Sequence, residues 1–107
     1  MDKAAEQRVR NLLGMAQRAR RVVSGSVAVE QAVKDGTAKL LLLAEDAEES
    51  TKKNYERLAE KYHIPWRVLL TRESMGASMG KEYRAAAALL DEGFSKSLCR
   101  MLGEYEN

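Results

Sequence analysis

Apolar side chains recur every three or four positions in five stretches of the chain, which is the spacing of amphipathic helices. In the first stretch, for example, Val9, Leu12 and Ala16 fall on one helical face. The pattern predicts helices over about residues 3–19, from a glycine turn at 24–26 to Gly36, over 51–62, for a short way after Thr71, and over 92–101. Polar residues occupy the opposite faces, so each helix is expected to cover one side of a core.

Short apolar runs between these helices predict strands. The step at 22–23 and the run at 66–70 are two of them, and the run at 39–44 contains four successive leucines. Four leucines in a row are typical of a strand buried on both faces. The alternation of helices and strands predicts one α/β domain over residues 1–107, a three-layer α/β/α sandwich with a four-stranded sheet.

The segment RAAAALL at 84–90 fits two structures. Alanine favours helix by intrinsic propensity. The place of the segment in the alternating order instead favours a strand crowded on both faces, where only small side chains fit. The residue pattern alone leaves both alternatives open.

Polar residues at the expected helix starts are candidate N-caps, because a side-chain oxygen there can accept a backbone N–H of the first turn. Ser24 or Ser26 would cap the second helix, and Ser50 or Thr51 the third. Gly25, between the two serines, can adopt backbone angles closed to other residues. The acidic tail after the last helix is expected to fray.

Charge is unevenly distributed along a chain whose formal net charge is +2. Residues 1–40 contain eight Lys or Arg and four Asp or Glu, whereas 41–62 contain four and six. A basic face can therefore form from the first third of the chain.

The chain has a single cysteine, and Arg8 and Arg10 interrupt any signal-peptide-like apolar stretch at its start. No apolar run approaches the roughly 20 residues that a membrane span needs. The sequence therefore favours a cytoplasmic protein without membrane contact.

Few residues offer enzyme chemistry. His63 is expected to face solvent at a helix end, and Cys99 is expected to be a buried, inert thiol. One histidine and one cysteine come close to excluding a Cys/His metal site, and the acids at 45–49 are expected to form a solvated loop. No GxxxxGK[ST] or GxGxxG spacing occurs. We therefore expect a protein that is not an enzyme and uses no metal or other cofactor.

Two features remain as candidates for binding. The first helix and the residues after it carry several arginines, and Lys or Arg side chains that neutralise phosphates supply affinity for RNA. The sequence GSVAVE at 25–30 places helix N–H groups beside a glycine, an arrangement that can hold an anion. A solvated basic face explains the arginines equally well, and a plain capped helix is the commoner explanation of the glycine turn.

Several longer stretches of the sequence resemble one known family. They are LLGMAQRARRVVSG near the start, AKLLLLAED at 38–46, HIPW at 63–66, ESMGASMGK at 73–81 and DEGFSKSL near the end. In this order they resemble the kink-turn RNA-binding ribosomal proteins of the archaeal L-seven-Ae and eukaryotic L-thirty type, especially the small bacterial members. The resemblance spans about residues 8–100.

The resemblance implies an α/β/α sandwich whose four-stranded sheet is mixed, with 84–90 as a strand. It also implies a ribosome-associated or ribosome-assembly protein that binds a sharply bent RNA element at the start of the second helix and at the loop before the last strand. Together with nearby basic residues, the residues expected to contact RNA are Arg20, Arg21, Gly25, Ser26, Val27, Ala28, Gln31, Lys34, Lys39, Gly80, Lys81, Glu82, Tyr83 and Arg84.

One departure from the family pattern concerns the second helix. Members that bind kink-turns tightly usually carry Asn-Glu after the glycine turn and a Lys one turn later, where this chain has Val27, Ala28 and Gln31. Valine and alanine side chains cannot make hydrogen bonds to base edges. The resemblance therefore implies RNA binding with altered kink-turn specificity, and Tyr83 either stacks on a base or covers the sheet edge.

The expected partner is RNA, ribosomal or kink-turn-like, with ribosomal proteins as further candidates, and the chain is expected to be a monomer. The alternative is a protein–protein adaptor that kept the fold and lost RNA recognition. Val27 and Ala28 favour this alternative, because they place an apolar patch where polar readers of RNA would lie.

Overall fold

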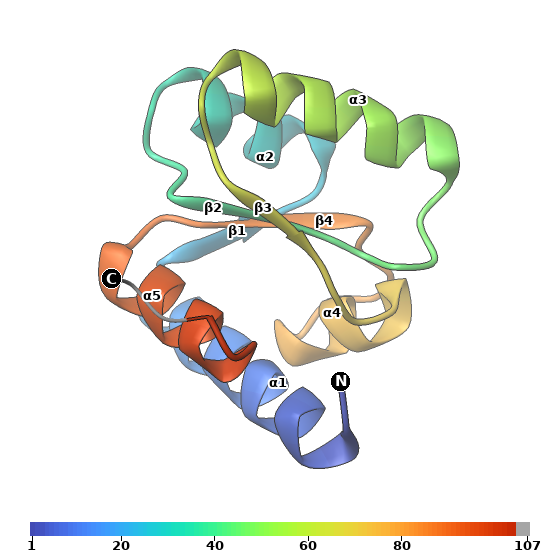
Figure 1. Cartoon of the computed structure of the whole chain (residues 1–107), viewed down its shortest axis with the longest axis vertical. Coiled ribbons are helices and arrows are strands. Elements are labelled where there is room, and N and C mark those ends of the chain that lie inside the picture. Colours follow the sequence, from blue (N-terminus) through green and yellow to red (C-terminus); the bar gives the residue numbers. More distant parts are fainter. Residues whose placement is uncertain (105–107) are drawn as a thin grey trace.

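The computed structural model describes residues 1–104, which form five helices and a four-stranded sheet (Figure 1). In chain order the elements are α1 (Lys3–Arg18), β1 (Val22–Ser24), α2 (Ser26–Lys34), β2 (Leu40–Leu43), α3 (Glu49–Lys61), β3 (Trp66–Val68), α4 (Arg72–Ser78), β4 (Ala86–Leu89) and α5 (Glu92–Met101). Helices α2 and α3 cover one face of the sheet, and α1, α4 and α5 cover the other. The predicted three-layer α/β/α sandwich is confirmed.

The sheet is mixed, with the strand order β1-β4-β2-β3. Strand β4 runs antiparallel to both β1 and β2, whereas β3 is parallel to β2. The segment 84–90, ambiguous by residue pattern, contributes the strand Ala86–Leu89, all of whose residues are buried. Burial between two helical layers outweighs the helix propensity of alanine here, because small side chains let both layers approach the strand.

Alternate residues of β2 belong to the cores on opposite faces of the sheet, as the pleat of a strand requires. Leu40 and Leu42 belong to the cluster beneath α1, α4 and α5, and Leu41 and Leu43 belong to the cluster facing α2 and α3. All four leucines are buried, so the expectation of a strand covered on both faces is confirmed.

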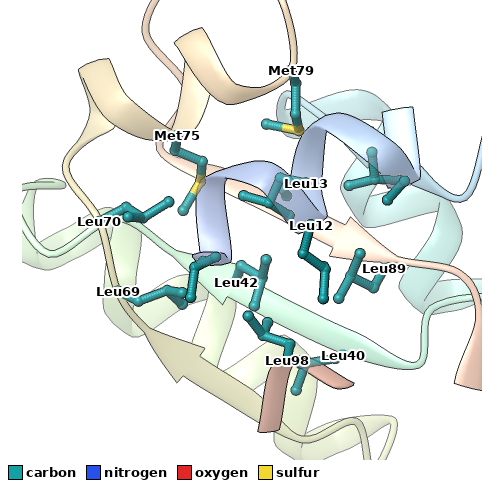
Figure 2. Close-up of a cluster of buried hydrophobic side chains, with 14 of the residues drawn as sticks. Leu12, Leu13, Leu40, Leu42, Leu69, Leu70, Met75, Met79, Leu89 and Leu98 are labelled. Carbon is teal, nitrogen blue, oxygen red and sulfur yellow. The ribbon is translucent and has the colours of Figure 1, made fainter. Parts of the chain in front are cut away.

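The larger cluster joins three helices to the sheet. Figure 2 shows Leu12 and Leu13 of α1, Met75 of α4 and Leu98 of α5 gathered around Leu42 of β2. Each of these side chains is at most 1% exposed. The first, fourth and last helices thus share one core, although they are far apart in the sequence.

The start of α2 differs from the predicted cap. Gly25 occupies the N-cap with a φ of 88°, and no side chain caps the first turn, so neither Ser24 nor Ser26 acts as predicted. The hydroxyl of Ser24 is engaged elsewhere, because it accepts a hydrogen bond from Arg84 Nε at 3.2 Å.

Helix α3 begins two residues before the predicted position. The Lys52 amide donates to the Glu48 carbonyl at 3.0 Å, which extends the helix back to Glu49. Glu48 is the N-cap and makes no side-chain capping bond, so neither Ser50 nor Thr51 is the cap.

Strand β3 ends earlier than the predicted 66–70. Leu70 adopts a φ of 61°, outside the strand region, and the chain turns there into α4. The predicted cap of α4 is confirmed, because Thr71 Oγ1 accepts a hydrogen bond from the Ser74 amide at 3.1 Å.

A side-chain hydrogen bond joins the last described residue, Glu104, to Arg67 of β3. Arg67 Nε donates to Glu104 Oε2 at 2.8 Å, and this hydrogen bond holds the pKa of the Glu104 carboxyl below its usual value. The part of the acidic tail at 105–107 that was expected to fray lies outside the described residues.

Helix α4 and the loop that follows it approach each other through backbone atoms. A β-carbon at Gly76 would lie 1.2 Å from the carbonyl oxygen of Glu82 and 2.5 Å from its carbonyl carbon, so no other residue fits. The Lys81 amide donates to the Gly76 carbonyl at 2.8 Å. The position of the loop at 80–84 therefore depends on this glycine.

Replacing Gly76 tests that dependence. We expect Gly76→Ala to lower the free energy of unfolding by about 2 kcal/mol or more, because overpacking typically costs about 1–3 kcal/mol and the clash here is with backbone. Urea denaturation followed by circular dichroism measures the change. The matched control is Gly14→Ala in α1, where the β-carbon would lie 3.4 Å from its nearest neighbour and the helix should gain about 0.5–1 kcal/mol. Equal stability of Gly76→Ala and the wild type would contradict the close approach.

Candidate nucleic-acid interface

The first turn of α2 is open to solvent. The N-cap, Gly25, has no side chain that could accept the N–H groups of the first turn, and Ser26, Val27 and Ala28 are all exposed. Val27 is 84% exposed, although it is apolar. The start of this helix therefore offers backbone donors beside an uncovered apolar side chain.

The loop at 80–84 lies next to this helix start. Gly80, with a φ of 70°, turns the chain out of α4, and the Arg84 amide donates to the Arg72 carbonyl at 3.1 Å. Tyr83 projects from the loop and is 67% exposed, which makes its ring available for contact. A hollow of about 300 Å³ beside the ring is lined by Glu73, Ala77, Lys81 and Glu82.

Arg84 joins the loop to the end of β1. Its Nε donates to Ser24 Oγ at 3.2 Å, and its Nη1 donates to the Tyr83 carbonyl at 2.9 Å. The Gly25 amide, one residue after Ser24, points to the Ala86 carbonyl at 3.4 Å. The two predicted segments, 25–31 and 80–84, thus form one continuous region, which we call the α2–loop surface.

Charge on the α2–loop surface is balanced. It contains two cations and two carboxylates, at Lys81, Arg84, Glu30 and Glu82. Beside Tyr83, the Asp46 carboxylate accepts the Arg72 amide at 2.8 Å and lies 3.6 Å from Arg72 Nε, so this neighbouring pair adds no net charge. Binding at this surface would therefore depend on backbone donors and an aromatic ring more than on an excess of positive charge.

The other predicted cations do not join this surface. The Leu90 amide donates to the Arg21 carbonyl at 2.8 Å, and the Lys39 amide donates to the Leu89 carbonyl at 2.7 Å. Arg21, Arg20 before it and Lys39 therefore adjoin the end of β4, whereas the α2–loop surface adjoins its start. The sequence could not distinguish these two places, because strand pairing decides them.

Lys34 lies at the far end of α2 from Gly25. Its Nζ is 4.0 Å from Glu30 Oε2, and both side chains are half-exposed. A hollow of about 300 Å³ between α2 and α3 is lined by these two residues together with Ser26 and Tyr55. Burial, with the Glu30 carboxylate as a second cause, raises the pKa of Tyr55 above its usual value.

The remaining candidates for chemistry are placed as follows. His63 is exposed at the end of α3, as predicted, and has a φ of 58°. Cys99 is half-buried on α5, less covered than predicted. Within residues 1–104, no three His, Cys, Asp or Glu side chains are grouped so that they could hold a metal ion. In the same part of the chain, no helix combines the length and apolarity needed to cross a bilayer.

Comparison with known families decides the relationship of this chain. Residues 7–99 match the model of the ribosomal protein L7Ae/L30e/S12e/Gadd45 family. The chain belongs to this family. The resemblance inferred from the sequence motifs is thereby confirmed over nearly the whole chain.

Two curated members of the family are similar along most of their length. RNA-binding protein YlxQ of Bacillus subtilis (strain 168) is 41% identical over 91 residues, which cover 85% of this chain and 91% of the relative. RNA-binding protein YlxQ of Enterococcus faecium is 29% identical over 96 residues, which cover 90% and 92%.

Two solved structures share the fold. A protein with unknown function from Bacillus halodurans C superposes with a TM-score of 0.84 at 35% identity, covering 90% of this chain and 97% of that one. The Giardia lamblia 15.5kD RNA binding protein superposes with a TM-score of 0.75 at 14% identity, covering 96% and 88%. At 14% identity the second likeness concerns the fold alone.

The bond between Arg84 and Ser24 was not foreseen from the sequence, because the two residues are 60 positions apart. We expect Arg84→Gln to loosen the loop at 80–84, with amide hydrogen exchange there several-fold faster and stability lower by about 1 kcal/mol, the usual net value of one hydrogen bond. Arg57→Gln on α3 is the control, since its guanidinium bonds only weakly to Asn54 at 3.4 Å. Unchanged exchange in the loop of Arg84→Gln would show that the bond does not hold it.

Proposed function

We propose that this protein binds RNA through the α2–loop surface. The observation that carries the proposal is the Arg84–Ser24 hydrogen bond, which joins the loop that carries the exposed Tyr83 to the residue before Gly25 at the open start of α2. Two curated relatives bear the name RNA-binding protein, which supports the same function.

The chemistry of the α2–loop surface suits an irregular RNA element. Backbone N–H groups at the start of α2 can donate to phosphates or base acceptors, and Gly25 allows RNA to approach the backbone closely. The Tyr83 ring can stack on an unpaired base, and Lys81 can approach a phosphate. Such unstacked bases occur in internal loops and bends and not in regular duplexes.

The residues exposed on α2 favour altered specificity within the family. Val27 and Ala28 present two apolar side chains in the first turn of the helix, and Gln31 presents one amide about a turn later. Recognition would then rest on RNA shape, stacking and backbone contacts more than on paired hydrogen bonds to guanine edges. We infer that the protein acts in the cytoplasm as a monomer on ribosomal or kink-turn-like RNA, on ribosomes or during their assembly, beside ribosomal proteins.

An electrophoretic mobility shift with a kink-turn RNA and ribosomal RNA fragments tests this function. We expect Tyr83→Ala to weaken binding by about 1–3 kcal/mol, because base stacking on an aromatic ring is worth that much. The matched control is Val68→Ala on β3, which removes another exposed apolar side chain away from the surface. Absence of wild-type binding to any of these RNAs at low salt would refute RNA binding as the function.

A protein–protein adaptor is the second candidate function. The 84% exposure of Val27 favours it, because a large uncovered apolar side chain is also typical of protein contacts. A partner that copurifies after nuclease treatment, and that Val27→Ser releases, would support the adaptor. Loss of every partner on nuclease treatment would support RNA.

Restoring polar residues on α2 tests the specificity. We expect Val27→Asn with Ala28→Glu to raise affinity for a kink-turn RNA at least tenfold, since each well-placed pair of hydrogen bonds to a base is worth about 1–3 kcal/mol. The same RNA with its sheared guanines replaced is the control and should not bind more tightly. If the wild type does not bind a kink-turn and the double variant does, the natural RNA target has a different structure. Equal affinity of the double variant and the wild type for the kink-turn RNA would contradict the placement of residues 27 and 28 against bases.

A further inference from the structure

A second basic region lies at the end of the sheet away from the α2–loop surface. There a cleft of about 340 Å³ separates α5 from the beginnings of β2 and β3. Its charged lining residues are Lys39, Arg67, Glu92, Lys96, Arg100 and Glu104. We call this region the α5 cleft.

Strand register and helix spacing bring these cations together. Lys39 immediately precedes β2. Two residues later, the Leu41 amide donates to the carbonyl of Pro65, the residue before β3, at 3.0 Å. Lys39 therefore lies beside the start of β3. Lys96 and Arg100 are four residues apart on α5 and therefore share one helical face. The cleft thus has a cation on the sheet side and two on the helix side.

The carboxylates of the lining balance half of its positive charge. The Arg67 guanidinium is held by Glu104, with Nε and Oε2 2.8 Å apart. In the described part of the chain, Lys39, Lys96 and Arg100 form no ion pair, and Glu92 is the remaining carboxylate of the lining. The α5 cleft therefore carries an excess of two positive charges, whereas the α2–loop surface carries none.

The lining favours a polyanion over a small specific ligand. Lys96 and Arg100 are exposed at the rim, where long side chains act as mobile point charges. Ser95 is the buried polar residue of the lining. Its hydroxyl oxygen is inaccessible to solvent, so it cannot hydrogen-bond to a ligand in the cleft. Cations at a rim without fixed polar groups suit a phosphodiester backbone, which positions a protein without reporting base sequence.

We propose that the α5 cleft is a second RNA contact, which binds backbone phosphates independently of sequence. This inference rests on the proposed function of RNA binding. The two regions adjoin opposite ends of β4, whose four residues span roughly 13 Å at about 3.3 Å per residue. An RNA held at the α2–loop surface must therefore extend around the molecule, or a second segment must occupy the α5 cleft.

The salt dependence of binding to a short RNA duplex without an internal loop tests this proposal. The triple variant Lys39→Gln, Lys96→Gln, Arg100→Gln is compared with Lys53→Gln, Arg57→Gln, Lys61→Gln, which removes three exposed cations from α3. We expect the first triple to reduce the slope of log affinity against log salt by about 2, since each lost phosphate contact contributes about 0.7–0.9. The control triple should keep the wild-type slope.

The outcomes separate the two proposals. Equal slopes for the two triples would overturn the α5 cleft as a contact, while wild-type binding to a kink-turn RNA would leave the proposed function standing. No binding of the wild type at low salt to the duplex, to the kink-turn RNA or to the ribosomal RNA fragments would overturn both. If the first triple does not fold, the double variant Lys96→Gln, Arg100→Gln changes only exposed residues and should lower the slope by about 1.5.

Discussion

The antiparallel pairing of β1 with β4 determines how the candidate interface is assembled. In this register Ser24 lies opposite Ala87, so the end of β1 and the start of β4 share one edge of the sheet. Helix α2 begins directly after β1, and the loop at 80–84 ends just before β4. A shift of one residue would exchange the side chains of β4 between the two cores and move Gly25 away from the loop, so core packing fixes the geometry of the surface.

Small residues make that register compatible with three layers. The alanines of β4 leave room for helices on both faces, and Gly76 lets the loop backbone rest against α4. Larger side chains at these positions would separate the layers or displace the loop. The same residues that complete the core therefore also hold the loop that carries Tyr83.

Much of the fold follows from the sequence, because apolar periodicity reports burial directly. The bounds of α5 coincide with the predicted 92–101, and the four leucines of β2 are buried as expected. The N-cap of α2 could not be predicted in the same way, because Ser24 bonds to Arg84, 60 residues away. Local pattern also could not decide between helix and strand for 84–90, where the neighbouring layers determine the structure.

The candidate site was predictable in part. The family resemblance brought together 25–31 and 80–84, and the structure places them side by side. A count of charges along the chain could not show that Arg20, Arg21 and Lys39 adjoin the other end of β4, because folding decides where each cation lies. The chain thus separates a surface without net charge, which has aromatic and backbone groups, from a basic cleft; this fits recognition at one place and electrostatic attraction at another.

Chemical-shift mapping of the isotope-labelled protein, titrated with an RNA hairpin that contains a purine-rich internal loop, tests the central claim most directly. We predict that amide shifts concentrate at 25–31 and 80–84, with the signals of α3 and of the Trp66 indole on β3 nearly unchanged. Shifts confined to α3, or no shifts at low salt, would contradict it.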